Sequence, residues 1–155
     1  MGLRKIRHVR VPVTDLRRSA GWYRRLLDLE LVGEFVEQGE LRGIVLVDKT
    51  GAYGIALRDR EYCASRPDLA GFDAFALEAD DLETLRQLAR RCDELGIAHN
   101  GVQDRGAYGA GLDIPDPDGT VLRFLANNPF SPGTFLGVEF TANGTPQVYQ
   151  TPRFE

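Results

Sequence analysis

Residues 6–29 of this 155-residue chain read IRHVRVPVTDLRRSAGWYRRLLDL and decide its fold. The first eight of them alternate between two kinds of side chain, which predicts a half-buried strand. One face of this strand carries Val9, Val11 and Val13, and the other carries His8, Arg10 and Pro12. The valine face is expected to pack in the core, so His8 and Arg10 should face whatever the sheet encloses.

An amphipathic helix is predicted directly after this strand. Asp15 stands where an N-cap residue is expected, and apolar side chains then recur at helical spacing. They are Leu16, Ala20, Tyr23 and Leu27. The helix should end near Asp28. Its four arginines, Arg17, Arg18, Arg24 and Arg25, are interpreted as a solvated basic face.

The same pattern returns 66 residues further along the chain. An alternating run begins near Ala74, Asp81 opens a second amphipathic helix, and Gly96 ends it where a C-cap glycine is typical. The interval from His8 to Asp15 recurs between Ala74 and Asp81. The chain is therefore interpreted as an α+β protein with two tandem βαβββ modules, each too small to bury its own sheet face.

Four segments are predicted along the chain. They are a first module at 1–59, a connector at 60–71, a second module at 72–127 and a C-terminal arm at 128–155. Further strands are expected at 29–37, 41–48, 53–58, 108–114 and 121–126. The arm combines prolines and glycines with aromatic residues, so it is expected to pack on the parent domain or on a partner subunit. Its aromatics, with Tyr53 and Tyr108, are the better candidates for cavity walls, whereas Trp22 and Tyr23 are expected in the core.

Composition narrows the function classes. The chain is 43% hydrophobic and 27% charged, which is typical of a globular protein. Its net charge of −4 argues against a mainly electrostatic nucleic-acid binder. No apolar run is long enough to span a bilayer, so no membrane partner is expected. The two cysteines, Cys63 and Cys92, are too few for a disulfide framework, and a reducing, cytoplasmic location is predicted.

Three motifs resemble the vicinal oxygen chelate superfamily, the group of glyoxalase I, bleomycin-resistance proteins, extradiol dioxygenases and fosfomycin-resistance enzymes. The first is the D-L-x-x-S-x-x-W-Y-x-x-L-L run from Asp15. The others are Ala-Asp-Asp-Leu at 79–82 and Asp-Pro-Asp-Gly at 116–119. The resemblance covers about residues 5–127. It implies that the two mixed sheets pair and curl around a central cavity, and that the protein is a homodimer.

In the metal-dependent members of that superfamily, four side chains hold one divalent cation, two of them usually histidine and two usually glutamate. By this resemblance the four positions fall on His8, Ala56, Ala74 and Arg123. Alanine offers no lone pair and a guanidinium would repel a cation, so the resemblance implies a member without metal or other cofactor. An alignment shifted to recruit Glu78 or Asp113 would restore a metal site and stays an alternative.

Strand parity predicts which charged residues face the cavity. They are His8, Arg10, Arg58, Glu78 and Arg123, beside small and apolar residues. Glu78 is expected to pair with one of the arginines, because an unpaired buried charge is costly. Arg123 is then expected to take the place of the lost cation and hold an anionic or carbonyl oxygen of a ligand. The alternative is that these arginines only bridge Glu78 and Asp113 or lie at strand ends in water.

Four functions are compatible with this set of residues, the last being a purely structural interaction domain in which the C-terminal arm fills the cavity. The first is sequestration of a small organic molecule, anionic or aromatic, with His8, Arg10, Arg58, Glu78, Asp113 and Arg123 as the candidate ligand-binding residues. The second is an isomerase, cyclase or lyase in which His8 or Glu78 moves a proton, these two being the candidate catalytic residues. The third is a metalloenzyme of the glyoxalase or dioxygenase type, which Ala56, Ala74 and Arg123 disfavour.

Overall fold

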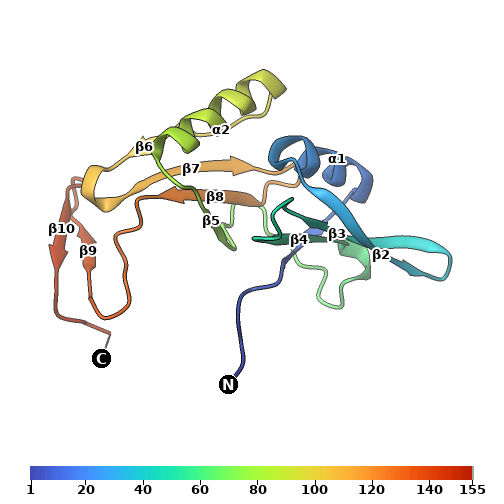
Figure 1. Ribbon diagram of the computed structural model, residues 1–155, viewed down its shortest axis with the longest axis horizontal. Coiled ribbons are helices and arrows are strands. Elements are labelled where there is room, and N and C mark those ends of the chain that lie inside the picture. The colour runs from blue at the N-terminus through green and yellow to red at the C-terminus, as the bar shows by residue number, and fades with distance from the viewer. Residues whose placement is uncertain (155) are drawn as a thin grey trace.

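Two four-stranded sheets, one from each half of the chain, form the body of the molecule (Figure 1). A computed structural model describes residues 1–154, so Glu155, the last residue of the predicted arm, lies outside the described residues. The first half contains β1 (Val9–Val13), α1 (Leu16–Leu27), β2 (Glu30–Glu37), β3 (Glu40–Val47) and β4 (Gly54–Asp59). Its sheet has the order β1-β4-β3-β2, in which β1 runs parallel to β4 and the other neighbours are antiparallel.

The second half repeats this arrangement. It contains β5 (Ala76–Glu78), α2 (Leu82–Leu95), β6 (Gln103–Asp104), β7 (Ala110–Pro115) and β8 (Val121–Ala126). Its order is β5-β8-β7-β6, again with the first strand parallel to the last. Arg10 pairs with Ala56 in the first sheet and Ala76 pairs with Arg123 in the second, so Arg123 occupies the position that Ala56 has in the first module. The predicted pair of βαβββ modules is confirmed.

Both helices begin and end where their capping residues predict. Asp15 accepts a hydrogen bond from the Arg18 amide at 2.9 Å, and Asp81 accepts one from the Thr84 amide at 2.8 Å. These carboxylates satisfy amides that have no partner within the helix. Gly96 ends α2 in the left-handed conformation, with φ of 66°. Asp28 ends α1 in the same region of φ and ψ.

Each helix covers one face of its own sheet (Figure 1). The hydrophobic core lies between the helices and the sheets that they cover. The large buried side chains of β1, β4, β7 and β8 stand at every second position of each strand, as a period of two requires, although β1 and β4 are also buried at the positions between. They include Val11, Val13, Ile55, Leu57, Leu112, Ile114, Leu122 and Phe124. In α1 the buried apolar residues are Trp22, Tyr23 and Leu26. The rest of the predicted stripe, Leu16, Ala20 and Leu27, is partly buried and packs against this core.

One buried hydrogen bond ties the two modules together. The Tyr23 hydroxyl on α1 donates to Asp116 Oδ2 at 2.9 Å, across 93 residues of sequence. The other oxygen of Asp116 accepts from the amides of Asp118 and Thr120, both at 2.9 Å. Two of the motifs quoted above, the Trp-Tyr pair and the Asp-Pro-Asp-Gly turn, therefore meet in space.

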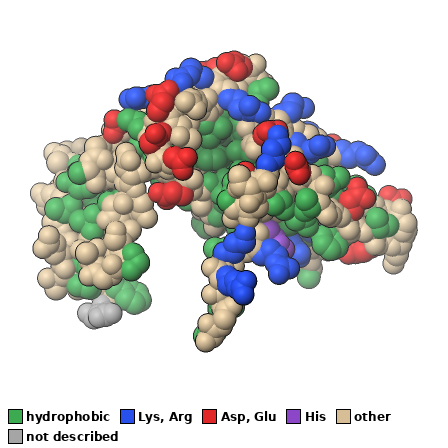
Figure 2. Space-filling model, viewed as in Figure 1, with side chains coloured by type: hydrophobic (Ala, Val, Ile, Leu, Met, Phe, Trp, Pro, Cys, Tyr) green, Lys and Arg blue, Asp and Glu red, His purple; other side chains and the backbone are tan. Residues whose placement is uncertain are grey.

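The segment after β8 forms a two-stranded hairpin of β9 (Gly137–Phe140) and β10 (Pro146–Tyr149). The hairpin stands at the end of the second sheet and projects away from the helices, and the molecule is hollowed beside it (Figures 1 and 2). No helix among residues 1–154 is both long enough and apolar enough to cross a membrane.

Candidate functional site

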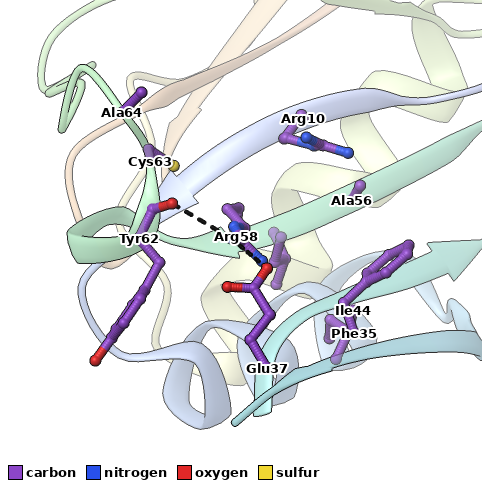
Figure 3. A pocket seen from close by; sticks show the side chains of 10 residues that line it. Arg10, Phe35, Glu37, Ile44, Ala56, Arg58, Tyr62, Cys63 and Ala64 are labelled. Atoms are coloured by element: carbon purple, nitrogen blue, oxygen red, sulfur yellow. Dashed lines mark hydrogen bonds and ion pairs between the residues drawn. The ribbon is translucent and has the colours of Figure 1, made fainter. Parts of the chain in front are cut away.

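The uncovered face of the first sheet carries a pocket of about 430 Å³ (Figure 3). Its floor is formed by β1 and β4, with Arg10 and Ala56 side by side in register. Phe35 and Glu37 come from β2, and the 3₁₀ turn at Arg60–Tyr62 closes the far end. Arg10 and Arg58 therefore reach this pocket, as strand parity predicted.

The two arginines of this pocket differ in how their charge is met. Arg58 donates to Glu37 Oε1 at 2.7 Å and to the Tyr62 carbonyl at 3.3 Å, and its side chain is largely covered (Figure 3). Within residues 1–154, Arg10 has neither an ion pair nor a side-chain hydrogen bond. Its guanidinium extends over the floor of the pocket near Ala56 (Figure 3). Arg10 is thus the cation of this pocket that is available to a ligand.

Aromatic rings supply the apolar part of the same pocket. Phe35 projects from β2 toward Ala56 and is 49% exposed (Figure 3). The Arg42 guanidinium lies over the ring of Tyr62, 3.5 Å from its centroid. A flat ring placed against Phe35 would lie within reach of the Arg10 guanidinium, which suits an aromatic anion.

A second pocket, of about 670 Å³, lies over the uncovered face of the second sheet. Its floor includes Asp113, Arg123 and Leu125, and the β9–β10 hairpin forms one of its walls. The predicted wall residue Tyr108 lines it, together with Phe130 and Phe140 of the arm. Tyr53 does not play the predicted part, because it packs against the core and its burial raises its pKa to about 12.

Arg123 is neutralised by carboxylates on both sides. Its Nε and Nη2 donate to the two oxygens of Asp113, each at 2.9 Å, and its Nη1 pairs with Asp73. The hydrogen bond with Asp113 raises the pKa of Arg123, with a smaller contribution from the charge of Asp73. This geometry matches the bridging alternative, with Asp113 and Asp73 as partners in place of Glu78. The expected pairing of Glu78 with an arginine is absent from residues 1–154, where Glu78 is exposed and forms no ion pair.

The candidate residues therefore fall into two groups on two sheets. Arg10 and Arg58 line the first pocket, and Asp113 and Arg123 line the second. His8 lies half-buried just before β1, with its Cβ beside Gly54, and lines neither pocket. Glu78 also lines neither. Sequence reasoning did not select Phe35, Glu37 and Tyr62. The register of β2 shifts between Phe35 and Val36, so parity counted along this strand does not place its side chains.

The residues at the four metal positions do not fit a divalent cation. His8 is the single donor, Ala56 and Ala74 have none, and the Arg123 guanidinium fills the fourth position. Of the two acids that a shifted alignment would recruit, Asp113 has both oxygens committed to Arg123, and Glu78 is exposed. Within residues 1–154, groups of three or more histidine, cysteine or acidic side chains with the spacing of a metal site are absent.

The chain was compared with protein families, with curated protein sequences and with solved structures. A family described as the Glyoxalase/Bleomycin resistance protein/Dioxygenase superfamily matches residues 5–124. No curated protein sequence matches the chain.

Several solved structures share the fold. TnmS3, an antibiotic binding protein from Streptomyces sp. CB03234, is 20% identical with a TM-score of 0.66, over 81% of this chain and 98% of that one. A superfamily member from Sphaerobacter thermophilus is 15% identical with a TM-score of 0.69, over 81% and 99%. A lactoylglutathione lyase from Agrobacterium tumefaciens is 20% identical with a TM-score of 0.62, over 79% and 92%. At these identities the likeness establishes the fold alone.

Proposed function

Because the chain belongs to the glyoxalase, bleomycin resistance and dioxygenase superfamily, we propose that it binds and sequesters a small aromatic anion without a metal ion. The site is the pocket over the first sheet. Arg10 holds the anionic group of the ligand, and Phe35 and Tyr62 contact its rings. Arg58, already bound to Glu37 and Tyr62, fixes the shape of the pocket rather than the charge of the ligand.

The observation that carries this proposal is the unpaired guanidinium of Arg10 in a pocket that Phe35 and Tyr62 also line (Figure 3). A charge that is not satisfied within the protein is available to form a charge-assisted hydrogen bond with a ligand. The volume of the pocket, about 430 Å³, lies within the range of small-molecule sites. A site of this kind binds without any bond being made or broken. The antibiotic binding protein TnmS3, with the same fold, supports such a role by analogy.

Binding is expected to be independent of divalent cations. The probe is anilinonaphthalene sulfonate, an aromatic anion whose fluorescence rises on burial. Its dissociation constant, measured by fluorescence titration, should stay within about twofold after dialysis against a chelator, since the four metal positions supply one donor. Elemental analysis of protein purified without chelator serves as the control. A stoichiometric transition metal, or binding abolished by the chelator, would contradict the proposal.

Sequestration also requires that the ligand leave unchanged. After prolonged incubation with the protein, the probe is separated and its mass compared with that of the starting compound. Because an isomerisation or cyclisation leaves the mass unchanged, the NMR spectrum of the recovered probe is compared as well. A change in either would favour a catalytic role, in which His8 or Glu78 moves a proton, over sequestration.

We further propose that the protein acts in the cytoplasm as a homodimer. Neither sheet has a helix on its second face. The edge strand β2 exposes four apolar side chains, Leu31, Val32, Phe35 and Val36. An exposed edge with apolar side chains is suited to contact with a second chain. The free thiols of Cys63 and Cys92 fit a reducing compartment. Light scattering coupled to gel filtration measures the mass in solution, and a monomer would remove the dimer from the proposal.

A further inference from the structure

The second pocket depends on a part of the chain that the family does not share. The superfamily match ends at residue 124, and half of the residues that line this pocket come after it. They belong to the end of β8, the loop through Phe130 and the β9–β10 hairpin. The first sheet has no such addition, so its pocket is bounded by module residues only.

The hairpin has an apolar face and a polar face. In its register Val138 pairs with Val148 and Phe140 pairs with Pro146, so these four side chains lie on one side. Three of them, Val138, Phe140 and Pro146, line the pocket. The opposite side carries the ion pair of Arg153 with Glu139 at 2.8 Å. The hairpin therefore turns its apolar side toward the second sheet.

An isolated two-stranded hairpin is marginally stable in water, so its position needs contacts beyond its own hydrogen bonds. Phe140 remains 65% exposed and Phe130 remains 61% exposed, although both face the pocket. These rings have apolar surface that a further apolar group in the pocket would cover. The volume of about 670 Å³ leaves room for a molecule of several rings.

The charges around this pocket indicate an uncharged occupant. The Arg123 guanidinium in the floor is already matched by Asp113 and Asp73. The remaining lining cation, Arg105, is exposed at the surface, where water and salt screen it. An anion in the floor would have to displace a carboxylate from Arg123, whereas a neutral ring system displaces only water.

We infer that the β9–β10 hairpin is the wall of a second ligand site, which takes a neutral, flat aromatic molecule between the hairpin and the second sheet. This inference extends the proposed function, because it adds a site of different charge preference to the same kind of binding. Phe130 and Phe140 are its contact residues, and the neutral floor sets the charge class of the ligand.

The test uses N-phenylnaphthylamine, which is anilinonaphthalene sulfonate without its sulfonate group. In the full chain, Phe140→Ala and Phe130→Ala should each weaken binding of this neutral probe about fivefold, because each removes a ring that stacks on it. Phe154→Ala is the matched control. Phe154 is a fully exposed aromatic of the same arm that does not line the pocket, so its loss should leave the affinity unchanged.

A second variant tests the hairpin without touching a lining side chain. A Cβ at Gly137 would overlap the ring of Tyr149 across the hairpin. Gly137→Ala should therefore push the Tyr149 ring off Gly137, loosen the packing of β10 on β9 and weaken the neutral probe, while anilinonaphthalene sulfonate still binds through Arg10. Circular dichroism and the thermal midpoint confirm that each variant is folded.

The outcomes separate this inference from the proposed function. If the sulfonate probe binds and the neutral probe is insensitive to both phenylalanine substitutions, the hairpin site is overturned and the first pocket stands. If neither probe binds the wild-type chain, both fail. If the substitutions weaken the neutral probe only by dissociating a dimer, as gel filtration would show, the hairpin is a subunit contact and the inference is overturned.

Discussion

Arg10→Ala is expected to weaken the binding of anilinonaphthalene sulfonate about 10- to 100-fold, which corresponds to the loss of a hydrogen bond between charged groups. The reason is that Arg10 is the unpaired cation of the first pocket, whereas Arg58 is committed to Glu37. Isothermal titration calorimetry measures the dissociation constant directly. The difference from wild type should shrink at high salt, because Arg10 is exposed and its attraction is screened.

Arg123→Ala provides the matched comparison for that experiment. Arg123 has the same side chain, also borne by a strand, but its charge is met by Asp113 and Asp73. Its removal should change the affinity for the sulfonate probe by less than about threefold. The opposite order of effects, with Arg123 dominant and Arg10 silent, would show that the cation substitute predicted at Arg123 is real and that the site proposed at Arg10 is not.

Asp116→Ala is expected to lower the free energy of unfolding by about 3 kcal/mol or more, since it leaves buried donors without an acceptor. The donors are the Tyr23 hydroxyl and the Thr120 amide, and both belong to buried residues. Chemical denaturation followed by tryptophan fluorescence measures the change, with Trp22 in contact with the Tyr23 ring as the reporter. Asp104→Ala, at an exposed acceptor for a local loop amide, should cost far less.

Asp116 also makes the free energy of unfolding depend on pH, and the direction of that dependence can be predicted. Burial raises the pKa of Asp116 above its usual value, and the hydrogen bonds from Tyr23 and the backbone only partly offset this. Because the folded-state pKa is the higher one, the contribution of this group to stability is fully present below the unfolded pKa and is lost as the pH rises through the folded pKa.

Comparison with Asp116→Asn isolates this contribution, because asparagine keeps the shape of the side chain and does not titrate. Between about pH 3 and about pH 7, the unfolding free energy of wild type should fall relative to that of the variant. A relative increase over this range would mean that the ionised carboxylate is stabilised in the fold and that its hydrogen bonds outweigh its burial.

Local patterns in the sequence were sufficient to predict most of the fold. The valine alternation of β1, the caps at Asp15 and Asp81 and the 66-residue repeat each depend on neighbours in the chain, so periodicity and capping chemistry reveal them. The same alternation predicted five charged residues on the inner faces. Arg10, Arg58 and Arg123 line the two pockets, whereas His8 and Glu78 line neither. The resemblance to the vicinal oxygen chelate superfamily then predicted that the two modules pair with each other.

Only the tertiary structure decided which charges are free and which pocket each one serves. The partners of Arg58 and Arg123 come from other strands and loops, Glu37 in one case and Asp73 and Asp113 in the other. Parity gives the face of a side chain but not the distance to a residue on another strand. The arm becomes a pocket wall for the same reason, because its position depends on contacts between segments far apart in sequence. What the sequence determined by itself is a pair of modules with three arginines on their inner faces, and what folding decided is that Arg10 alone among these three is left without an ionic partner within residues 1–154.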